Sequence, residues 1–96
     1  MERRVLSETE IASELKKLDG WQAEDGKLIR GYKFATFAES LAFVNRVGEI
    51  DEAADHHPDI TFGWGYAEIA TTTHDRGGVT DVDLSLATKI NNLDVD

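Results

Sequence analysis

The chain has 96 residues, of which 41% are apolar and 30% charged, and its net charge is −9. Domains typically contain roughly 100–150 residues, so this length predicts a single domain over residues 1–96. The composition is too apolar for a disordered chain. The absence of cysteine excludes disulfides, thiolate nucleophiles and cysteine-ligated metal sites. The acidic balance argues against nucleic acid as a partner, because phosphate binding needs a basic surface.

The negative charge is confined to the second half of the chain. Residues 1–48 contain eight acidic and eight basic residues, whereas residues 49–96 contain eleven acidic residues and two basic ones. All three histidines, His56, His57 and His74, lie in this acidic half, so we expect the chemistry there. No apolar run approaches the roughly 18 residues of a membrane span. Because no apolar stretch follows Arg3–Arg4, a signal peptide is not expected either, and we predict a cytoplasmic protein.

The first predicted elements are a helix and a β-hairpin. A capping box at Ser7 and Glu10 starts the helix, which is expected to stop at Asp19–Gly20. Asp25–Gly26 is a strong signal for a two-residue turn between two strands. These strands are predicted over residues 21–23 and 27–34, with Leu28, Arg30, Tyr32 and Phe34 on one face of the second.

A long second helix is predicted over residues 37–55. Thr36 and Glu39 are expected to form another capping box at its start. An apolar stripe recurs at helical spacing along it. The stripe consists of Phe37, Leu41, Val44 and Val47, widened by Phe43 and Ile50. Because Pro58 disfavours the helical conformation in the residue before it, His57 should be extended just beyond the helix end.

Two more strands and a third helix complete the predicted order. Residues 60–64 and 66–73 are rich in β-branched and aromatic side chains, with a tight connection at Gly63–Trp64–Gly65. Thr80 caps the last helix, which should end near Asn91–Asn92. The order helix, strand, strand, helix, strand, strand, helix predicts an α+β fold with an antiparallel sheet.

The three histidines suit acid–base chemistry. Unperturbed imidazole titrates near pH 6.5, and nearby carboxylates together with a helix C-terminus favour its protonated form. The carboxylates close to the histidines in sequence are those of Glu52, Asp55, Asp59 and Asp75. Imidazoles poised near neutrality can both donate and accept protons. A dehydration needs both, because an acid must protonate the leaving hydroxyl while a base removes a proton elsewhere.

A metal site is the rival interpretation of the same residues. Three histidines with carboxylates nearby would suit Zn²⁺ or Fe²⁺. The spacing argues against it, because His56 and His57 are neighbours that point apart and the chain contains no H-x-x-x-H pair. Acid–base chemistry without a metal is therefore the favoured interpretation.

One pattern in this region resembles a known family. Glu52, His56-His57-Pro58, Trp64, His74 and Asp83 have the spacing of the pterin-4a-carbinolamine dehydratases, known in animals also as a dimerisation cofactor of a homeodomain transcription factor. The resemblance implies a four-stranded antiparallel sheet with three helices packed on one face. It also implies dehydration of a 4a-hydroxytetrahydropterin, such as 4a-hydroxytetrahydrobiopterin, to quinonoid dihydropterin, with no metal and no organic cofactor.

The resemblance further implies roles for individual residues. His56 and His74 resemble the acid–base pair, and His57 resembles a substrate-orienting residue. Glu52 and Asp83 match acidic positions that would hold the histidines without contacting substrate. An acid at position 83 is also an ordinary helix cap. The positions that match the pterin-contacting segments are Asp55, Pro58, Thr73, Asp75 and Arg76.

The implied partners are a small pterin and further copies of the chain, as a homodimer or homotetramer, with no nucleic acid and no membrane. The alternative function is a protein-binding or coactivator module that docks a partner through the long second helix. That helix would offer Phe37, Leu41, Phe43 and Val44. The same side chains could instead pack on the protein's own sheet or on a second copy.

Overall fold

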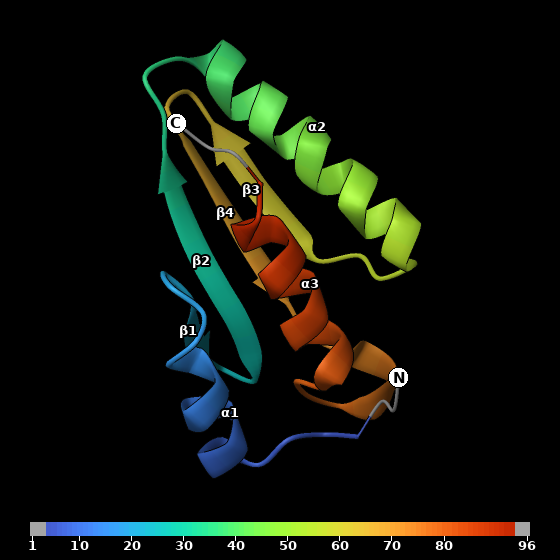
Figure 1. The fold of residues 1–96 in the computed structure, drawn as a ribbon. Helices are drawn as coiled ribbons and strands as arrows, with labels where there is room; N and C mark the ends of the chain where they lie inside the picture. Colours follow the sequence, from blue (N-terminus) through green and yellow to red (C-terminus); the bar gives the residue numbers. More distant parts are fainter. Residues whose placement is uncertain (1–3, 94–96) are drawn as a thin grey trace.

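The computed structural model describes residues 4–93, which form a four-stranded antiparallel sheet with three α-helices on one face (Figure 1). The elements in chain order are α1 (Glu8–Leu15), β1 (Gln22–Glu24), β2 (Lys27–Lys33), α2 (Phe37–Ala54), β3 (Asp59–Gly63), β4 (Tyr66–Thr71), the short 3₁₀ helix η1 (His74–Arg76) and α3 (Asp81–Asn91). The strands lie in the order β1-β2-β4-β3. The predicted α+β fold, its element order and its one-sided helix layer are therefore confirmed. None of the described helices is long and apolar enough to cross a membrane.

The two faces of the sheet differ in what covers them. Successive side chains of a strand point to opposite faces. In β4, Ala67, Ile69 and Thr71 point to the helix side and are at most 1% exposed, whereas Tyr66 and Glu68 point away and are exposed. The register of β2 against β4 places three side chains that were predicted to share a face on the covered side of the sheet, namely Leu28, Arg30 and Tyr32.

The first helix is shorter than predicted. Its capping box forms, with the Glu10 N–H donating to Ser7 Oγ at 3.1 Å and the Ser7 N–H donating to Glu10 Oε1 at 2.8 Å. The helix ends at Leu15, because the chain tightens and the Leu18 N–H donates three residues back to the Leu15 carbonyl at 3.1 Å. This tighter turn still brings Leu18 into the core, where it is 7% exposed.

The hairpins follow the predicted turn chemistry, with strand ends that shift by one or two residues. Asp25 and Gly26 both have positive φ, 51° and 76°, as a two-residue turn between twisted strands requires. Trp64 and Gly65 make the tight β3–β4 connection, with Gly65 at φ 82°. Thr73 lies outside β4, which ends at Thr71.

α2 buries a stripe that differs from the predicted one. Its buried residues are Ser40, Phe43, Val47 and Asp51. Phe37 and Leu41 are 44% and 39% exposed, so the prediction that they belong to the buried stripe is wrong. β3 is the edge strand beneath α2, so this side of the helix reaches past the sheet (Figure 1). Phe37 keeps one aromatic contact there, with Phe62 of β3 at 5.8 Å between ring centroids.

The predicted capping box at the start of α2 forms only in part. The Glu39 N–H donates to Thr36 Oγ1 at 3.1 Å. The Glu39 carboxylate, however, accepts from the N–H of Ala35 at 3.0 Å and not from that of Thr36. Both bonds still satisfy backbone donors at the helix start.

The other end of α2 places a non-glycine residue in the left-handed region. Asp55 has φ 52° and ψ 43°, and its N–H donates to the carbonyls of Asp51 and Glu52. This conformation ends helices and is usually adopted by glycine or asparagine. The turn redirects the chain into His56 and His57.

We predict that the backbone conformation at Asp55 limits stability. Asp55→Ala should cost about 1 kcal/mol, because the short polar side chain of aspartate tolerates the left-handed region better than alanine does, whereas Asp55→Gly, which has no Cβ, should be at least as stable as Asp55→Ala. Urea unfolding measures both. Asp25, at φ 51° in the β1–β2 turn, is the matched control for the backbone effect alone. A lower stability for Asp55→Gly than for Asp55→Ala would contradict the assignment of the effect to the left-handed backbone.

Candidate active site

The centre of the site is the carboxylate of Asp83, the third residue of α3, which is 0% exposed. Its Oδ1 accepts from His56 Nε2 and from the Thr71 hydroxyl, each at 2.6 Å. Its Oδ2 accepts from the Thr73 hydroxyl at 2.8 Å and from the Thr80 N–H at 2.9 Å. An ionised carboxylate only accepts hydrogen bonds and has about four positions for donors. Four donors from three parts of the fold therefore saturate it.

Local sequence rules explain how these donors reach one carboxylate. Thr71 and Thr73 are two residues apart, so alternation directs both to the helix side of the sheet. Thr80 and Asp83 form the predicted capping box of α3. The hydroxyls of Thr73 and Thr80 also bond to each other at 2.8 Å. Asp83 is thus both a helix cap and the partner of His56, the two interpretations that its position allowed.

His56 is held rigidly in this cluster. Its side chain is 8% exposed, and its Nε2 faces Asp83. Because the Asp83 carboxylate accepts a hydrogen bond there, Nε2 carries the proton. Nδ1 is then the ring atom able to exchange a proton. The backbone is fixed as well, because the His56 N–H donates to the Asp51 carbonyl at 3.1 Å.

His57 lies in a contrasting environment. Its side chain is 56% exposed, and its Nε2 contacts Glu52 Oε2 at 3.0 Å. The hydrogen bond to Glu52 raises the pKa of His57, and the charges of Glu52, Asp55 and Asp51 act in the same direction. The two neighbouring rings therefore take different partners, one buried and one in solvent.

His74 begins η1 in the loop that follows β4, and its side chain is exposed. The loop is closed at its base, where the Thr73 N–H donates to the Gly78 carbonyl at 3.0 Å. Gly77 completes the turn with φ 79°. Because the Thr73 hydroxyl is bound to Asp83, His74 follows directly on a residue of the cluster that holds His56.

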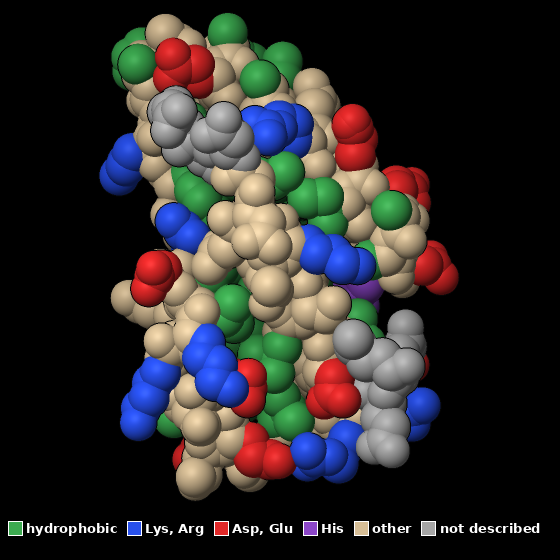
Figure 2. All heavy atoms as spheres, in the orientation of Figure 1, with side chains coloured by type: hydrophobic (Ala, Val, Ile, Leu, Met, Phe, Trp, Pro, Cys, Tyr) green, Lys and Arg blue, Asp and Glu red, His purple; other side chains and the backbone are tan. Residues whose placement is uncertain are grey.

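The structure gathers the predicted site residues into two segments joined by Asp83. The end of α2 and the turn after it carry Glu52, Asp55, His56, His57 and Pro58, and the loop after β4 carries Thr73, His74, Asp75 and Arg76. Figure 2 shows histidine atoms at the surface beside the C-terminal end of α2. Thr73, predicted to contact pterin, is 1% exposed, and its hydroxyl is engaged with Asp83.

Two members of this region are not predicted from the sequence. Thr71 was assigned only to a strand, although its two-residue spacing from Thr73 could have indicated a shared face. Asp51 is 3% exposed, four residues after the buried Val47. Its spacing along α2 could have placed it on the buried face, but an acidic residue gives no apolar signal there.

The metal interpretation finds no ligand set in the described part of the chain. Over residues 4–93, no three histidine, aspartate or glutamate side chains are grouped to hold an ion. The Nε2 atoms of His56 and His57 face Asp83 and Glu52.

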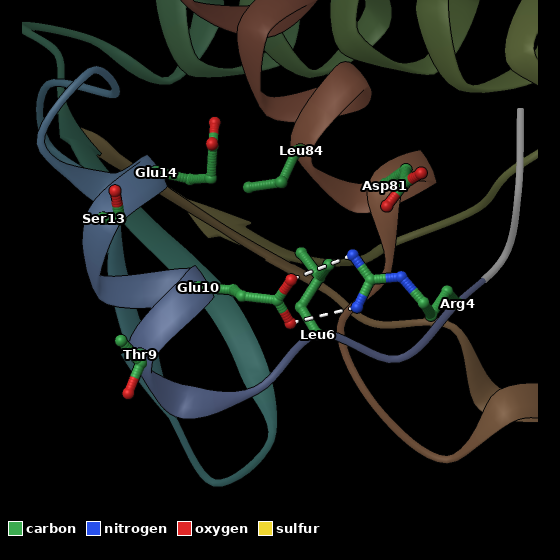
Figure 3. A pocket seen from close by; sticks show the side chains of 8 residues that line it. All are labelled: Arg4, Leu6, Thr9, Glu10, Ser13, Glu14, Asp81 and Leu84. Carbon is green, nitrogen blue, oxygen red and sulfur yellow. Dashed lines mark hydrogen bonds and ion pairs between the residues drawn. The ribbon is translucent and has the colours of Figure 1, made fainter.

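A separate cavity of about 480 Å³ lies between the N-terminal segment, α1 and α3 (Figure 3). Its lining includes Arg4, Glu10 and Asp81 but none of the predicted site residues. Arg4 donates to both carboxylate oxygens of Glu10, at 3.0 and 2.9 Å. These bonds, with the one from the Ser7 N–H, lower the pKa of Glu10 to about 2. The Arg4–Glu10 pair therefore serves the start of α1.

Comparison with known proteins identifies the family. The family model described as pterin 4 alpha carbinolamine dehydratase matches residues 4–93, which is all of the chain that the structure describes. The chain belongs to this family. Every motif residue from Glu52 to Asp83 lies within the matched range.

Individual members of the family are similar over nearly their whole length. A relative from Thermomicrobium roseum, named "Putative pterin-4-alpha-carbinolamine dehydratase", is 44% identical over 92% of this chain and 95% of its own. A crystal structure from Brucella melitensis, described as a transcriptional coactivator/pterin dehydratase, has a TM-score of 0.86 at 32% identity, covering 92% of this chain and 96% of the other. A pterin dehydratase-like RuBisCO assembly factor of the α-carboxysome has a TM-score of 0.59 at 22% identity, covering 74% and 82%, and so shares the fold alone.

We predict that Asp83→Ala destabilises the protein by about 3–5 kcal/mol, because it leaves buried donors without an acceptor. Urea unfolding measures the loss. Asp81→Ala is the matched control, since it removes another acid from the first turn of α3 and should cost less than about 1 kcal/mol. Equal losses in the two variants would show that Asp83 acts only through the helix dipole.

We also predict that Glu52→Gln lowers the pKa of His57, because the hydrogen bond to Glu52 is the main cause of its raised value. NMR titration of the histidine ring protons measures the midpoint. Glu49→Gln removes one acid from an exposed position of the same helix and should leave His57 unchanged. An unchanged midpoint in the Glu52 variant would contradict the assignment.

Proposed function

We propose that the chain dehydrates a 4a-hydroxytetrahydropterin to quinonoid dihydropterin and water by histidine acid–base catalysis. Membership of the family supports the reaction class. The observation that carries the mechanism is the buried His56–Asp83 pair at 2.6 Å, with an exposed histidine on the adjoining loop. No redox cofactor is needed, because the reaction only moves protons and expels water.

His56 and His74 are the proposed acid–base pair. One imidazolium gives its proton to the 4a-hydroxyl, the C4a–O bond breaks, and water leaves. The other imidazole takes a proton from a ring nitrogen, whose N–H electrons form the new C=N bond. In His56 the exchanging atom is Nδ1, because Nε2 is bound to Asp83. Asp83 stabilises the imidazolium and fixes the ring, which lowers the cost of orienting it for the reaction.

His57 is the proposed substrate-orienting residue. It is exposed, and Glu52 favours its protonated form, so it offers a cationic donor at the surface beside His56. Asp55, Pro58, Asp75 and Arg76 are exposed or partly exposed on the two segments and are proposed to contact the pterin. For Thr73 we propose a supporting role, because its hydroxyl is already bound to Asp83.

The remaining features of the proposal concern substrate choice and assembly. Tetrahydrobiopterin is one natural source of the proposed 4a-hydroxy substrate. We propose that the reaction takes place in the cytoplasm, without metal or cofactor. A homodimer or homotetramer is also proposed. The exposed apolar side chains of Phe37, Leu41 and Trp64 support association with further copies of the chain.

A coactivator role is the second candidate. The exposure of Phe37 and Leu41 on α2 favours it, and so does the description of the Brucella melitensis structure. Phe43, in contrast, is 3% exposed and packs on Tyr32 at 4.4 Å between ring centroids, so it is not available to a partner. A stable complex with another protein, in a sample that does not turn over pterin, would favour this role.

We predict that His56→Ala and His74→Ala each lower kcat by about 10²–10⁴-fold, the usual worth of a positioned acid or base. His57→Ala should mainly raise KM, because it orients substrate. Decay of the carbinolamine absorbance measures each rate, with the natural tetrahydropterins compared side by side. Glu24→Gln, on exposed β1, is the control for a remote charge. Wild-type protein that fails to speed the decay would refute the proposed function.

A further inference from the structure

One buried carboxyl near the histidines has no part in the mechanism above. Asp51 follows Phe43 and Val47 along the buried face of α2 and is 3% exposed. Its Oδ1 is buried and has no hydrogen-bond partner among the described residues. Burying a polar atom without a partner costs free energy, and for a carboxylate the cost is larger. An alanine or leucine would fill this position without that cost.

The position of Asp51 ties it to both adjacent histidines. Its backbone carbonyl accepts from the Asp55 N–H and, at 3.1 Å, from the His56 N–H, so it lies under the turn that carries the two rings. Burial raises the pKa of Asp51 to about 6, against the opposing charges of His57 and then His56. Its carboxyl therefore titrates in the range where imidazoles do.

Few other charges face this carboxyl. On α2 itself the nearby acid is Glu52, whose charge raises the pKa of Asp51. On α3, the facing acid is Asp83, which is bound to His56. The side chains that β3 and β4 turn to the helix side are uncharged, namely Ile60 and Phe62 of β3 and Ala67, Ile69 and Thr71 of β4. The charge of Asp51 therefore acts chiefly on the His56–His57 pair.

We propose that Asp51 is a positioning residue for this pair: its buried carboxylate stabilises the positive charge that the two rings carry when protonated, without touching substrate. The inference rests on the proposed function for its catalytic meaning. When Asp51 is ionised, it favours the protonated form of His57. When Asp51 gains a proton at lower pH, it no longer carries the charge that favours the protonated form of His57.

Asp51 also carries a stability cost that depends on pH. Its pKa is higher in the folded chain than the ordinary value of about 4, so the unfolded chain loses this proton first. As pH rises from about 4 to about 6, ionisation of Asp51 therefore disfavours the folded state. Asp51→Asn should remove this part of the pH dependence, because asparagine does not ionise.

The test is a histidine NMR titration of the full chain, in parallel with kcat against pH. In Asp51→Asn the midpoint of His57 should fall by about half a pH unit, and the acidic limb of kcat should move to lower pH with it. Glu49→Gln, an exposed acid on the same helix, should move neither. An unmoved His57 midpoint in a folded Asp51→Asn variant would overturn the inference, since a purely structural carboxyl would alter stability alone.

A second measurement needs no variant. In the wild-type protein, the side-chain carboxyl carbon of Asp51 should titrate with a midpoint of about 6. A midpoint at the ordinary value of about 4 would overturn the inference even if Asp51→Asn did not fold. The two proposals remain separable. If the His57 midpoint shifts in a protein without pterin turnover, the result counts against the proposed function and supports the effect of Asp51 on His57. If pterin is turned over but the His57 midpoint does not shift, the result supports the proposed function and counts against the effect of Asp51.

Discussion

The saturated carboxylate of Asp83 is the interaction on which the rest of the site depends. It joins the turn after α2, the end of β4 and the first turn of α3, which are the three parts of the fold that carry site residues. A buried carboxylate is tolerated only when donors replace its water. The sheet and helices must therefore close fully before this acid is satisfied. Closure of the fold and alignment of His56 are the same event.

This arrangement divides the histidines by burial. His56 is fixed through its ring and its backbone, while His57, the next residue, and His74, in the loop after β4, are exposed. In the proposed mechanism, a rigidly held acid–base group beside two exposed histidines suits a reaction in which a small substrate enters from solvent. The fixed ring holds its geometry before substrate arrives, so little reorganisation is needed during proton transfer. The fold alone would not imply this, because similar folds serve other purposes.

The structure also gives the excess of acids in the second half a physical meaning. Three of them face histidines directly or by charge: Asp83 holds His56, Glu52 holds His57, and Asp51 lies beneath both. The Asp83 carboxylate is saturated with donors, that of Glu52 is exposed, and that of Asp51 is buried with no hydrogen-bond partner for its Oδ1 among the described residues. One uniform charge count thus separates into three environments for a carboxylate beside an imidazole.

The sequence by itself determined the element types, their order and the family motif, since capping boxes, turn pairs and strand alternation act over a few residues. Ser7 with Glu10 and Asp25 with Gly26 formed as predicted for that reason. The tertiary structure decided which side chains meet. His56 and Asp83 are 27 residues apart, and no local period encodes their contact. Likewise, the edge position of β3 exposed Phe37, and the packing of α2 buried Asp51, because burial depends on what lies opposite a helix and not on its own pattern.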